Sequence, residues 1–252
     1  MKIAGVIPSR WGSTRFPGKS LASIAGKPMI QWVVERVKQA KELDVVIVAT
    51  DDDRISECVR SLNIPDVQVA MTRPDHPTGT DRIAEAVEHL DLDAVINVQG
   101  DEPLIDPALI DELAGVISSN EWDMATAATP VEEEHQITEP SVVKVVFNRH
   151  GQALYFSRST IPHIREPEGL PDPGIYWRHI GIYAYRRDYL LKLVAEPPCE
   201  MEQLEKLEQL RALDMGCRMK VIKTRDFGIG VDTPEDIAKA EQLLNQQETN
   251  HD

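Results

Sequence analysis

The stretch IAGVIPSRWGSTRFPGK, residues 3–19, decides how the fold of this chain begins. Residues 3–7 form an apolar run of the kind that makes a buried strand. The loop that follows is rich in small residues and carries three cations, Arg10, Arg15 and Lys19. Small residues let a ligand approach the backbone, while arginine and lysine bind phosphate oxygens. This pattern indicates a polyphosphate site, with an ordinary solvated loop bearing surface cations as the alternative.

The better-known phosphate motifs are absent from the sequence. It contains no G-x-x-x-x-G-K-[ST] loop, and no G-x-G-x-x-G follows the first apolar run. A bound nucleotide must therefore be held in another way. Serine-nucleophile chemistry has no support either, because there is no G-x-S-x-G elbow, and no H-E-x-x-H metal helix occurs.

The composition is that of an acidic globular protein. The 252 residues are 42% hydrophobic, and we expect them to form one domain, 1–252, because no linker or internal repeat divides them. A formal net charge of −15 argues against binding to nucleic acid, which needs a broad basic surface. An acidic protein that binds an anionic ligand must concentrate positive charge locally, often with the help of a divalent metal.

The cysteines and the apolar runs predict the compartment. Cys58, Cys199 and Cys217 form no C-x-x-C pair, which favours a reducing environment. Met1 leads directly into the first apolar run, and no run approaches the roughly 20 residues that cross a bilayer. We therefore expect a cytoplasmic protein without membrane insertion.

Strand and helix patterns alternate through the first half of the chain. The predicted strands are residues 3–7, 45–49, 67–70 and 94–98, and the predicted helices are 28–43, 54–62, 80–90 and 107–118. Such alternation is typical of parallel β-α-β units, in which ligands bind beyond the carboxyl ends of the strands. Polar loops stand at three of those ends, at residues 8–19, 50–53 and 99–103.

The second half is less regular. Its predicted strands are residues 124–130, 142–147, 179–185 and 219–223, and its predicted helices are 202–213 and 232–246. Residues 166–173 hold three prolines and two glycines and are interpreted as a surface loop.

Two aspartates are candidates for a metal site. Asp101 follows a predicted strand, and Asp232 follows a short apolar stretch before a predicted helix. Magnesium prefers such hard oxygen ligands and bridges them to phosphates. The alternatives are a turn aspartate at Asp101 and a helix start at Asp232, where Thr233 is a candidate N-cap. The neighbouring acids Asp51 and Asp52 are interpreted as caps of the following helix.

Further polar residues could contact a nucleobase or a second substrate. The loop 72–82 is rich in short donors and acceptors, although it could simply lead into a capped helix. Arg158, Arg178 and His179 could bind an anionic substrate, with surface salt bridges as the alternative. Glu208 and Gln209 fall on the predicted helix 202–213, where a solvated face is the plainer interpretation.

Taken together, the motifs resemble the sugar-acid cytidylyltransferases, and more narrowly the 3-deoxy-manno-octulosonate cytidylyltransferase family. The resemblance runs in order over nearly the whole chain. It is carried by IPSR (7–10), STRFPGK (13–19), VATD (48–51), MTR (71–73), His76, GTDR (79–82), NVQGDEP (97–103), ALYFSR (153–158), HIGIY (179–183), LEQLR (207–211) and VDTPED (231–236).

The resemblance implies an enzyme that transfers CMP from CTP to the sugar acid 3-deoxy-manno-octulosonate (KDO) for lipopolysaccharide synthesis and releases pyrophosphate. It implies a Rossmann-like α/β nucleotidyltransferase fold with a mainly parallel sheet flanked by helices, a smaller dimerisation and sugar-binding subregion, and a homodimer. The implied roles are CTP binding by Arg10, Thr14, Arg15, Lys19, Thr72, Arg73, Thr78, Gly79 and Thr80, magnesium binding by Asp101 and Asp232, and sugar-acid binding by Gln99, Arg158, His179, Glu208 and Gln209. Arg10, Lys19 and the two aspartates would carry the chemistry.

Alternatives within and outside this family remain. Positions 77 and 78 read Pro-Thr where the family more usually has Gln-Ser, but Arg73 and His76 favour KDO over its 8-amino form. The rivals are a cytidylyltransferase for 8-amino-KDO or sialic acid, and a non-catalytic CTP-binding sensor. We expect no dedicated histidine base, because none stands near Asp101 in the sequence.

Overall fold

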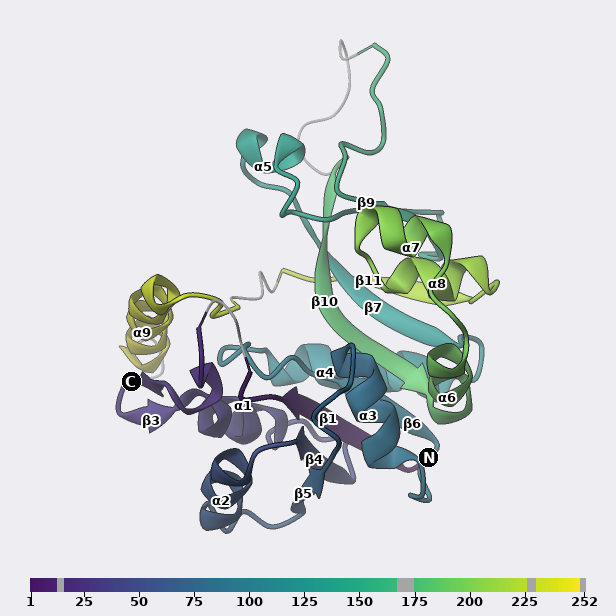
Figure 1. Ribbon diagram of the computed structural model, residues 1–252. Coiled ribbons are helices and arrows are strands. Elements are labelled where there is room, and N and C mark those ends of the chain that lie inside the picture. Colours follow the sequence, from purple (N-terminus) through teal and green to yellow (C-terminus); the bar gives the residue numbers. More distant parts are fainter. Residues whose placement is uncertain (13–15, 167–174, 226–229, 250–252) are drawn as a thin grey trace.

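A mixed sheet runs through the molecule (Figure 1), which we describe from a computed structural model for residues 1–12, 16–166, 175–225 and 230–249, with side chains to residue 244. The sheet has nine strands within these residues. They are β1 (Ile3–Ser9), β4 (Val45–Thr50), β5 (Val67–Met71), β6 (Ala94–Asn97), β7 (Met124–Pro130), β8 (Lys144–Phe147), β9 (Ala153–Ser157), β10 (Trp177–Arg186) and β11 (Met219–Lys223). A separate hairpin pairs β2 (Ser23–Ile24) with β3 (Lys27–Pro28).

The strand order is β11-β7-β10-β6-β1-β4-β5, and β8 joins β10 and β9 to one side. Strand β1 pairs in parallel with β4 and β6, β4 with β5, and β7 with β11. Strand β10 is antiparallel to both of its neighbours, β6 and β7. The other six strands of this order are therefore parallel to one another, and β10 runs in the opposite direction.

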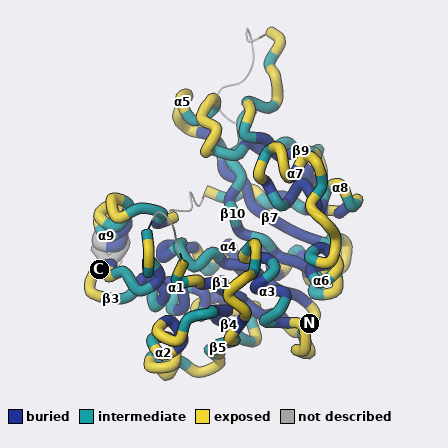
Figure 2. Tube along the Cα trace, in the orientation of Figure 1, coloured by how far each residue is buried: buried dark blue, intermediate teal, exposed yellow. Residues whose placement is uncertain are grey.

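Helices cover both faces of the sheet. They are α1 (Met29–Val37), α2 (Asp53–Ser61), α3 (Gly79–Val87), α4 (Pro107–Ser118), α5 (Glu134–Thr138), α6 (Arg187–Ala195), α7 (Glu200–Glu205), α8 (Gln209–Asp214), α9 (Pro234–Thr249) and the short 3-10 turn η1 (Lys19–Leu21). Helices α1, α2 and α4 pack on one face, and α3, α6 and α8 pack on the other. Alternate residues of β1 serve the two cores, Ile3 and Ile7 on the first and Ala4 and Val6 on the second. Figure 2 shows the resulting buried layer along β1, β6, β7 and β10.

A third apolar cluster attaches α9 to the start of the chain. Ile24 and Met29 pack there against Val231, Ala240 and Leu244. The last helix therefore lies beside β3 and α1 (Figure 1), although nearly 200 residues separate the end of α1 from the start of α9. This arrangement brings the segment before α9 to the carboxyl end of β1.

Most predicted elements of the first half are confirmed, with corrections at their ends. Helix α1 ends at Val37 rather than at residue 43, because the chain turns back there to begin β4. Helix α3 begins at Gly79, one residue earlier than predicted, and Thr78 is its N-cap. Asp52 caps α2 as predicted, but Asp51 does not, and instead forms an ion pair with Arg82.

The larger corrections fall in the second half. The single helix predicted over 202–213 is wrong, because Lys206 adopts a left-handed conformation with φ of 54° and separates α7 from α8. Helices α5 and α6 were not predicted. The predicted surface loop 166–173 lies outside the described residues except at its first position.

Candidate functional site

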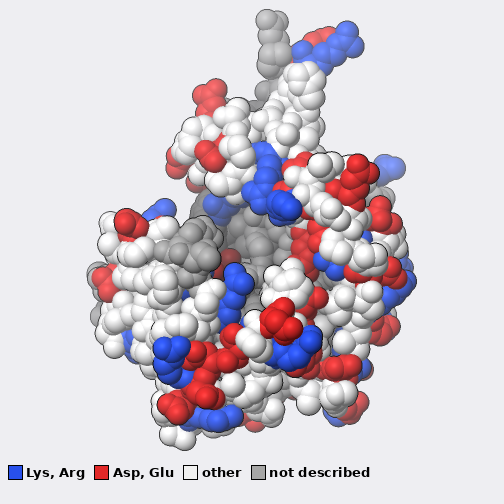
Figure 3. Space-filling view, in the orientation of Figure 1, with Lys and Arg blue, Asp and Glu red and all other residues white. Residues whose placement is uncertain are grey.

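A polar pocket of about 270 Å³ opens at the carboxyl ends of the parallel strands. Its lining comes from four segments that are distant in sequence: Pro8, Ser9, Arg10, Lys19 and Ser20; His76, Pro77, Thr78, Gly79 and Arg82; Gln99, Gly100 and Asp101; and Asp232. We call it the first pocket. The face in Figure 3 is hollowed at its centre, with basic side chains above and below the hollow.

Lys19 and two acids meet in the first pocket. The Lys19 ammonium group pairs with the Asp101 carboxylate, and its Nζ lies 3.2 Å from Oδ1 of Asp232. The backbone joins the same segments, because the Val231 amide donates to the Asp101 carbonyl at 2.8 Å. The two candidate metal ligands therefore converge on one cation.

The start of α9 uses a different carboxylate. Oδ2 of Asp236 accepts hydrogen bonds from the amides of Asp232 and Thr233 and from the Thr233 hydroxyl. From the sequence, the plainer role for Asp232 was to start a helix in which Thr233 is the N-cap. Because Asp236 accepts these bonds, the side chain of Asp232 is directed to Lys19.

The loop after β6 fits closely against the loop after β1. A Cβ atom at Gly100 would lie 2.7 Å from the carbonyl oxygen of Pro8, which is closer than van der Waals contact allows. Glycine at this position lets the two loops approach, and Asp101 follows it directly. The close approach thus places the Asp101 carboxylate beside Lys19.

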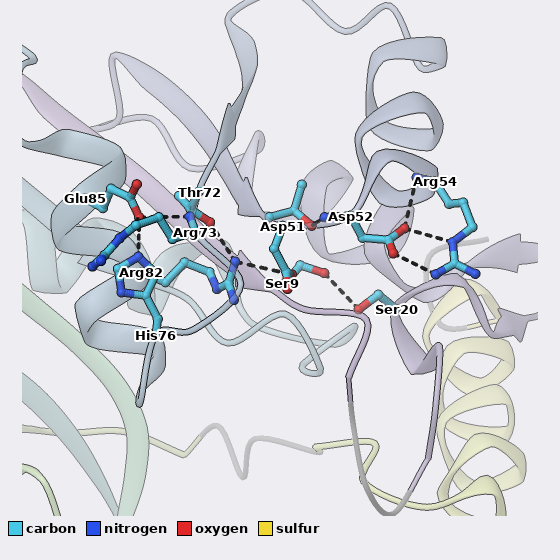
Figure 4. Close-up of polar contacts among 11 residues, drawn as sticks. Ser9, Ser20, Asp51, Asp52, Arg54, Thr72, Arg73, His76, Arg82 and Glu85 are labelled. Atoms are coloured by element: carbon cyan, nitrogen blue, oxygen red, sulfur yellow. Dashed lines mark hydrogen bonds and ion pairs between the residues drawn. The ribbon is translucent and has the colours of Figure 1, made fainter.

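A hydrogen-bonded loop leads into α3 and lines one side of the first pocket. The Thr78 hydroxyl accepts from the Asp81 amide, and the Asp81 carboxylate accepts from the Thr78 amide, which forms a capping box. His76 pairs with Glu85, which also accepts from the Arg73 amide (Figure 4). Burial favours the neutral acid, but these bonds outweigh it and lower the pKa of Glu85.

Arg82 lies under this loop with only 3% of its surface exposed. Its Nη1 donates to the Thr72 hydroxyl at 2.6 Å and lies 3.3 Å from Oδ1 of Asp51 (Figure 4). One buried guanidinium group therefore ties the ends of β4 and β5 to α3. The sequence placed Arg82 at the end of the polar loop 72–82 but gave it no role of its own, since an arginine in a helix pattern usually lies on the solvated face.

A second pocket of about 200 Å³ adjoins the first and shares Gly79 and Gln99 with it. We call it the second pocket. Its other lining residues are Thr80, Asn97, Met124, Tyr183, Tyr185, Leu193, Glu208 and Gln209. Gln99 is held at the junction by a 3.2 Å hydrogen bond from its side-chain amide to the carbonyl of Gly181.

The ionisable groups of the second pocket are buried in part, as Glu208 and Tyr183 are, or fully, as Tyr185 is. Burial raises the pKa of Glu208, although hydrogen bonds with Thr80 and Thr78 act in the opposite direction. Burial likewise raises the pKa of Tyr183 and of Tyr185. The helix pattern suggested that Glu208 lies on a solvated face, and this interpretation is wrong. The break at Lys206 directs the Glu208 side chain toward the second pocket, which it lines.

His179 stands in strand β10 close to these tyrosines. Its Nε2 lies 2.9 Å from the Thr126 hydroxyl, and its ring contacts those of Phe156 and Tyr183. Burial, followed by the charge of Arg178, lowers the pKa of His179 to about 3. The imidazole is therefore neutral at neutral pH.

Arg158 is placed differently from the pocket residues. Its guanidinium group donates to three backbone carbonyls, those of Pro140, Glu205 and Lys206. Its amide donates to the Glu205 carboxylate at 2.9 Å. In this arrangement Arg158 fastens the end of β9 to the turn that separates α7 from α8.

Most of the predicted site residues come together in the two pockets. The first pocket gathers Arg10, Lys19, Thr78, Gly79, Gln99, Asp101 and Asp232, and the second gathers Thr80, Glu208 and Gln209. Thr72, Arg73, Arg158 and His179 are not among the described residues that line these two pockets. Thr14 and Arg15 lie outside the described residues.

Several pocket residues were given no individual role from the sequence. They are Pro8, Ser9, Ser20, His76, Pro77, Arg82, Gly100, Asn97, Met124, Tyr183, Tyr185 and Leu193. A signal existed for Asn97, which is a polar residue inside the apolar run 94–98. The tyrosines gave none, since aromatic residues are ordinary in strands.

Comparison with known proteins defines first the class and then the family. Residues 4–222 match the family model described as Cytidylyltransferase. A 3-deoxy-manno-octulosonate cytidylyltransferase of Geobacter sulfurreducens is 47% identical over 97% of this chain and 100% of its own length. One from Syntrophotalea carbinolica is 48% identical over 97% of this chain and 99% of its own length.

A solved structure agrees with these relatives. It is described as CMP:2-keto-3-deoxy-manno-octonic acid synthetase complexed with CTP, and it has a TM-score of 0.91 and 42% identity. It covers 98% of this chain, and this chain covers all of it. The chain belongs to the family of 3-deoxy-manno-octulosonate cytidylyltransferases.

The helices were compared with the requirements for crossing a lipid bilayer. None of the helices within the described residues combines the length and apolar character that a bilayer crossing requires.

Proposed function

We propose that this protein transfers CMP from CTP to KDO, with the first pocket holding the triphosphate and the second pocket holding the sugar acid. The observation that carries the proposal is the meeting of the two pockets at Gly79 and Gln99. A charged pocket that adjoins a second pocket with a mixed polar and aromatic lining would let two different substrates lie next to each other. Proximity of this kind removes much of the entropic barrier to a bimolecular reaction.

The reaction needs charge neutralisation more than covalent chemistry. The anomeric oxygen of KDO forms a bond to the α-phosphorus, and the bond from that phosphorus to pyrophosphate breaks. The hydroxyl proton passes to solvent. Arg10 and Lys19 offset the negative charge of the triphosphate and of the leaving pyrophosphate.

The donors in the first pocket suit magnesium. Asp101 and Asp232 provide hard carboxylate oxygens on either side of one cation, Lys19. Within the described residues no larger group of acids, histidines or cysteines gathers, which leaves ligand positions for phosphate and water. We propose that these two acids hold Mg²⁺, which when bound would offset phosphate charge and orient the substrates.

A histidine base is not part of the proposal. His179 is the histidine beside the second pocket, and a pKa of about 3 makes it a poor proton acceptor near pH 7. Its bond to Thr126 and its ring contacts fit a role in shaping the pocket wall. The roles in CTP or sugar-acid binding that the resemblance gave to Thr14, Arg15, Thr72, Arg73, Arg158 and His179 stay predictions.

The homodimer and the cytoplasmic location are also proposals. Light scattering at several protein concentrations would test the first, with a constant monomer mass as the contradicting result. Fractionation of a cell that expresses the native chain would test the second. The single domain, 1–252, stays a prediction that limited proteolysis would check.

The decisive experiment measures pyrophosphate release with CTP and a panel of sugar acids in the presence of Mg²⁺. We expect KDO to be used with a kcat/KM at least tenfold above those of 8-amino-KDO and sialic acid. Preference for either rival would reassign the substrate. Binding of CTP without any pyrophosphate release would instead support the sensor hypothesis.

A further inference from the structure

Two pairs of residues close the base of the loop that joins β1 to η1. The inner pair is Ser9 and Ser20, whose buried hydroxyls share a 2.8 Å hydrogen bond (Figure 4). The outer pair is Trp11 and Gly18, joined by a 3.2 Å bond from the Gly18 amide to the Trp11 carbonyl. Arg10 follows Ser9 and Lys19 precedes Ser20, so two of the cations that line the first pocket lie in sequence between these pairs.

The outer pair is held by packing as well as by its hydrogen bond. Gly18 has a φ of 69°, and a Cβ atom there would lie 2.8 Å from the Trp11 ring. Glycine is thus required twice, by its backbone conformation and by the ring above it. Trp11 also packs against the core that α1, α2 and α4 share with the sheet.

Arg54 covers Trp11 from the first turn of α2. Its guanidinium carbon lies 3.2 Å from the centroid of the Trp11 ring. The same group is oriented by Asp52, since Nε donates to Oδ1 at 3.0 Å and Nη2 to Oδ2 at 2.7 Å (Figure 4). A planar guanidinium group that is held by a carboxylate and stacked on an aromatic ring fixes the position of that ring.

We propose that Arg54 is a positioning residue for CTP binding, which acts through Trp11 to fix the spacing of Arg10 and Lys19. Arg54 lies outside the residues that line either pocket and touches no proposed substrate group. Arg54 would fix the position of the outer pair, Trp11 and Gly18, because it stacks on Trp11. The hydrogen bond of the buried inner pair would form with or without Arg54. The inference rests on the proposed use of CTP by the first pocket.

A purely structural role for Arg54 makes a different prediction. Its side chain is 55% exposed, and an exposed ion pair with Asp52 contributes little to stability. If Arg54 only supported the start of α2, its loss would affect all kinetic constants alike or none of them. A positioning role instead predicts a selective loss of CTP affinity.

The test compares Arg54→Ala and Arg54→Lys with Arg60→Ala, a matched control that removes an exposed arginine from the other end of the same helix. The measurements are the Kd for CTP by calorimetry without sugar acid, and then kcat and the KM values for both substrates. We expect Arg54→Ala to raise the Kd and KM for CTP about 5- to 10-fold, with kcat and the KM for KDO within about twofold. Arg54→Lys restores less than half of the loss, because lysine keeps the charge but not the planar fork.

The proposal is overturned if Arg54→Ala binds CTP as tightly as Arg60→Ala, or if Arg54→Lys restores full affinity. If Arg54→Ala does not fold, Trp11→Ala and Trp11→Phe replace it, and equal CTP affinity in these two variants overturns the proposal. A wild-type protein that binds CTP but forms no CMP–KDO counts against the proposed function alone, since the comparison of Kd values still stands.

Discussion

The two pockets are built from different parts of the fold. The first pocket is made by loops at the ends of parallel strands, and its charged groups pair with one another, as Lys19 does with Asp101. The second pocket is made by side chains from within β6 and β10 and by the break between α7 and α8. Its acid, Glu208, is half-buried and has a raised pKa.

The difference indicates how each pocket acts. Charged loop residues at a strand end can stabilise negative charge that develops during the reaction. Shielded side chains on a sheet offer shape and fixed hydrogen bonds, which favour selection of a substrate. Changes in the first pocket are therefore expected to affect turnover and CTP, and changes in the second to affect the sugar acid.

The largest effect is expected at Asp101. Asp101→Asn keeps the shape of the side chain but removes its charge, so kcat should fall about 10³-fold or more. The fold should survive, because this side chain lies on a loop and is 27% exposed. Pyrophosphate release at saturating substrates and thermal melting test both statements.

The matched control for Asp101 is Asp91→Asn, a surface carboxylate that pairs with Lys2 and is 93% exposed. It should leave kcat unchanged. Near-wild-type turnover of Asp101→Asn would remove this residue from the proposed magnesium site.

A smaller effect is expected at Lys19. Lys19→Ala removes a cation from the first pocket, and kcat/KM for CTP should fall about 100-fold while the KM for KDO changes little. Lys38→Ala, which removes a surface partner of Asp66, is the control. Unchanged KM and kcat values for CTP would contradict the role of Lys19.

An effect on the sugar acid rather than on CTP is expected at Glu208. Glu208→Gln should raise the KM for KDO about tenfold and leave the KM for CTP unaltered. The reason is that Glu208 lines the second pocket and not the first. Glu200→Gln, an exposed position on α7, is the control. An equal rise in both KM values would show that the pockets do not divide the substrates in this way.

The raised pKa of Glu208 also predicts a pH dependence of stability. Burial makes the Glu208 carboxyl bind its proton more tightly in the folded protein than in the unfolded chain. The protonated carboxyl therefore contributes fully to the stability of the fold below the ordinary pKa of 4.5. This contribution to stability is lost as pH rises through the pKa of the folded state. The melting temperature of Glu208→Gln should therefore gain on that of the wild type as pH rises, and a constant difference would contradict the assignment.

The smallest effect is expected in the pH profile of His179→Ala. Since the pKa of His179 is about 3, its ring stays neutral throughout assays from about pH 5.5 to 8. The pH–rate profile should therefore keep its shape in the variant, whatever the change in its height. A wild-type inflection near pH 6.5 that disappears in His179→Ala would identify this residue as a base.

The sequence predicted the first pocket well for a physical reason. Apolar runs that end in polar residues mark the carboxyl ends of buried strands, and parallel strands bring those ends to one edge. Arg10, Lys19, Gln99 and Asp101 could be placed in this way. Asp232 was harder, since only the packing of α9 on Ile24 and Met29 brings it to the site.

The second pocket was not predictable from the same signals. Tyr183 and Tyr185 are indistinguishable in sequence from core residues of a strand. The break at Lys206 has no glycine or proline to announce it, and its left-handed backbone is stabilised by tertiary contacts such as those of Arg158. The resemblance to a family, rather than periodicity, pointed to Glu208 and Gln209.

The ammonium group of Lys19 between Asp101 and Asp232 has a consequence for the resting enzyme. Two neighbouring carboxylates repel each other, and the ammonium group between them offsets that repulsion before any substrate arrives. If Mg²⁺ binds these two acids as proposed, it would displace Lys19, which would then face the incoming phosphate. The affinity for the ion and the affinity for the triphosphate are thereby expected to rise together.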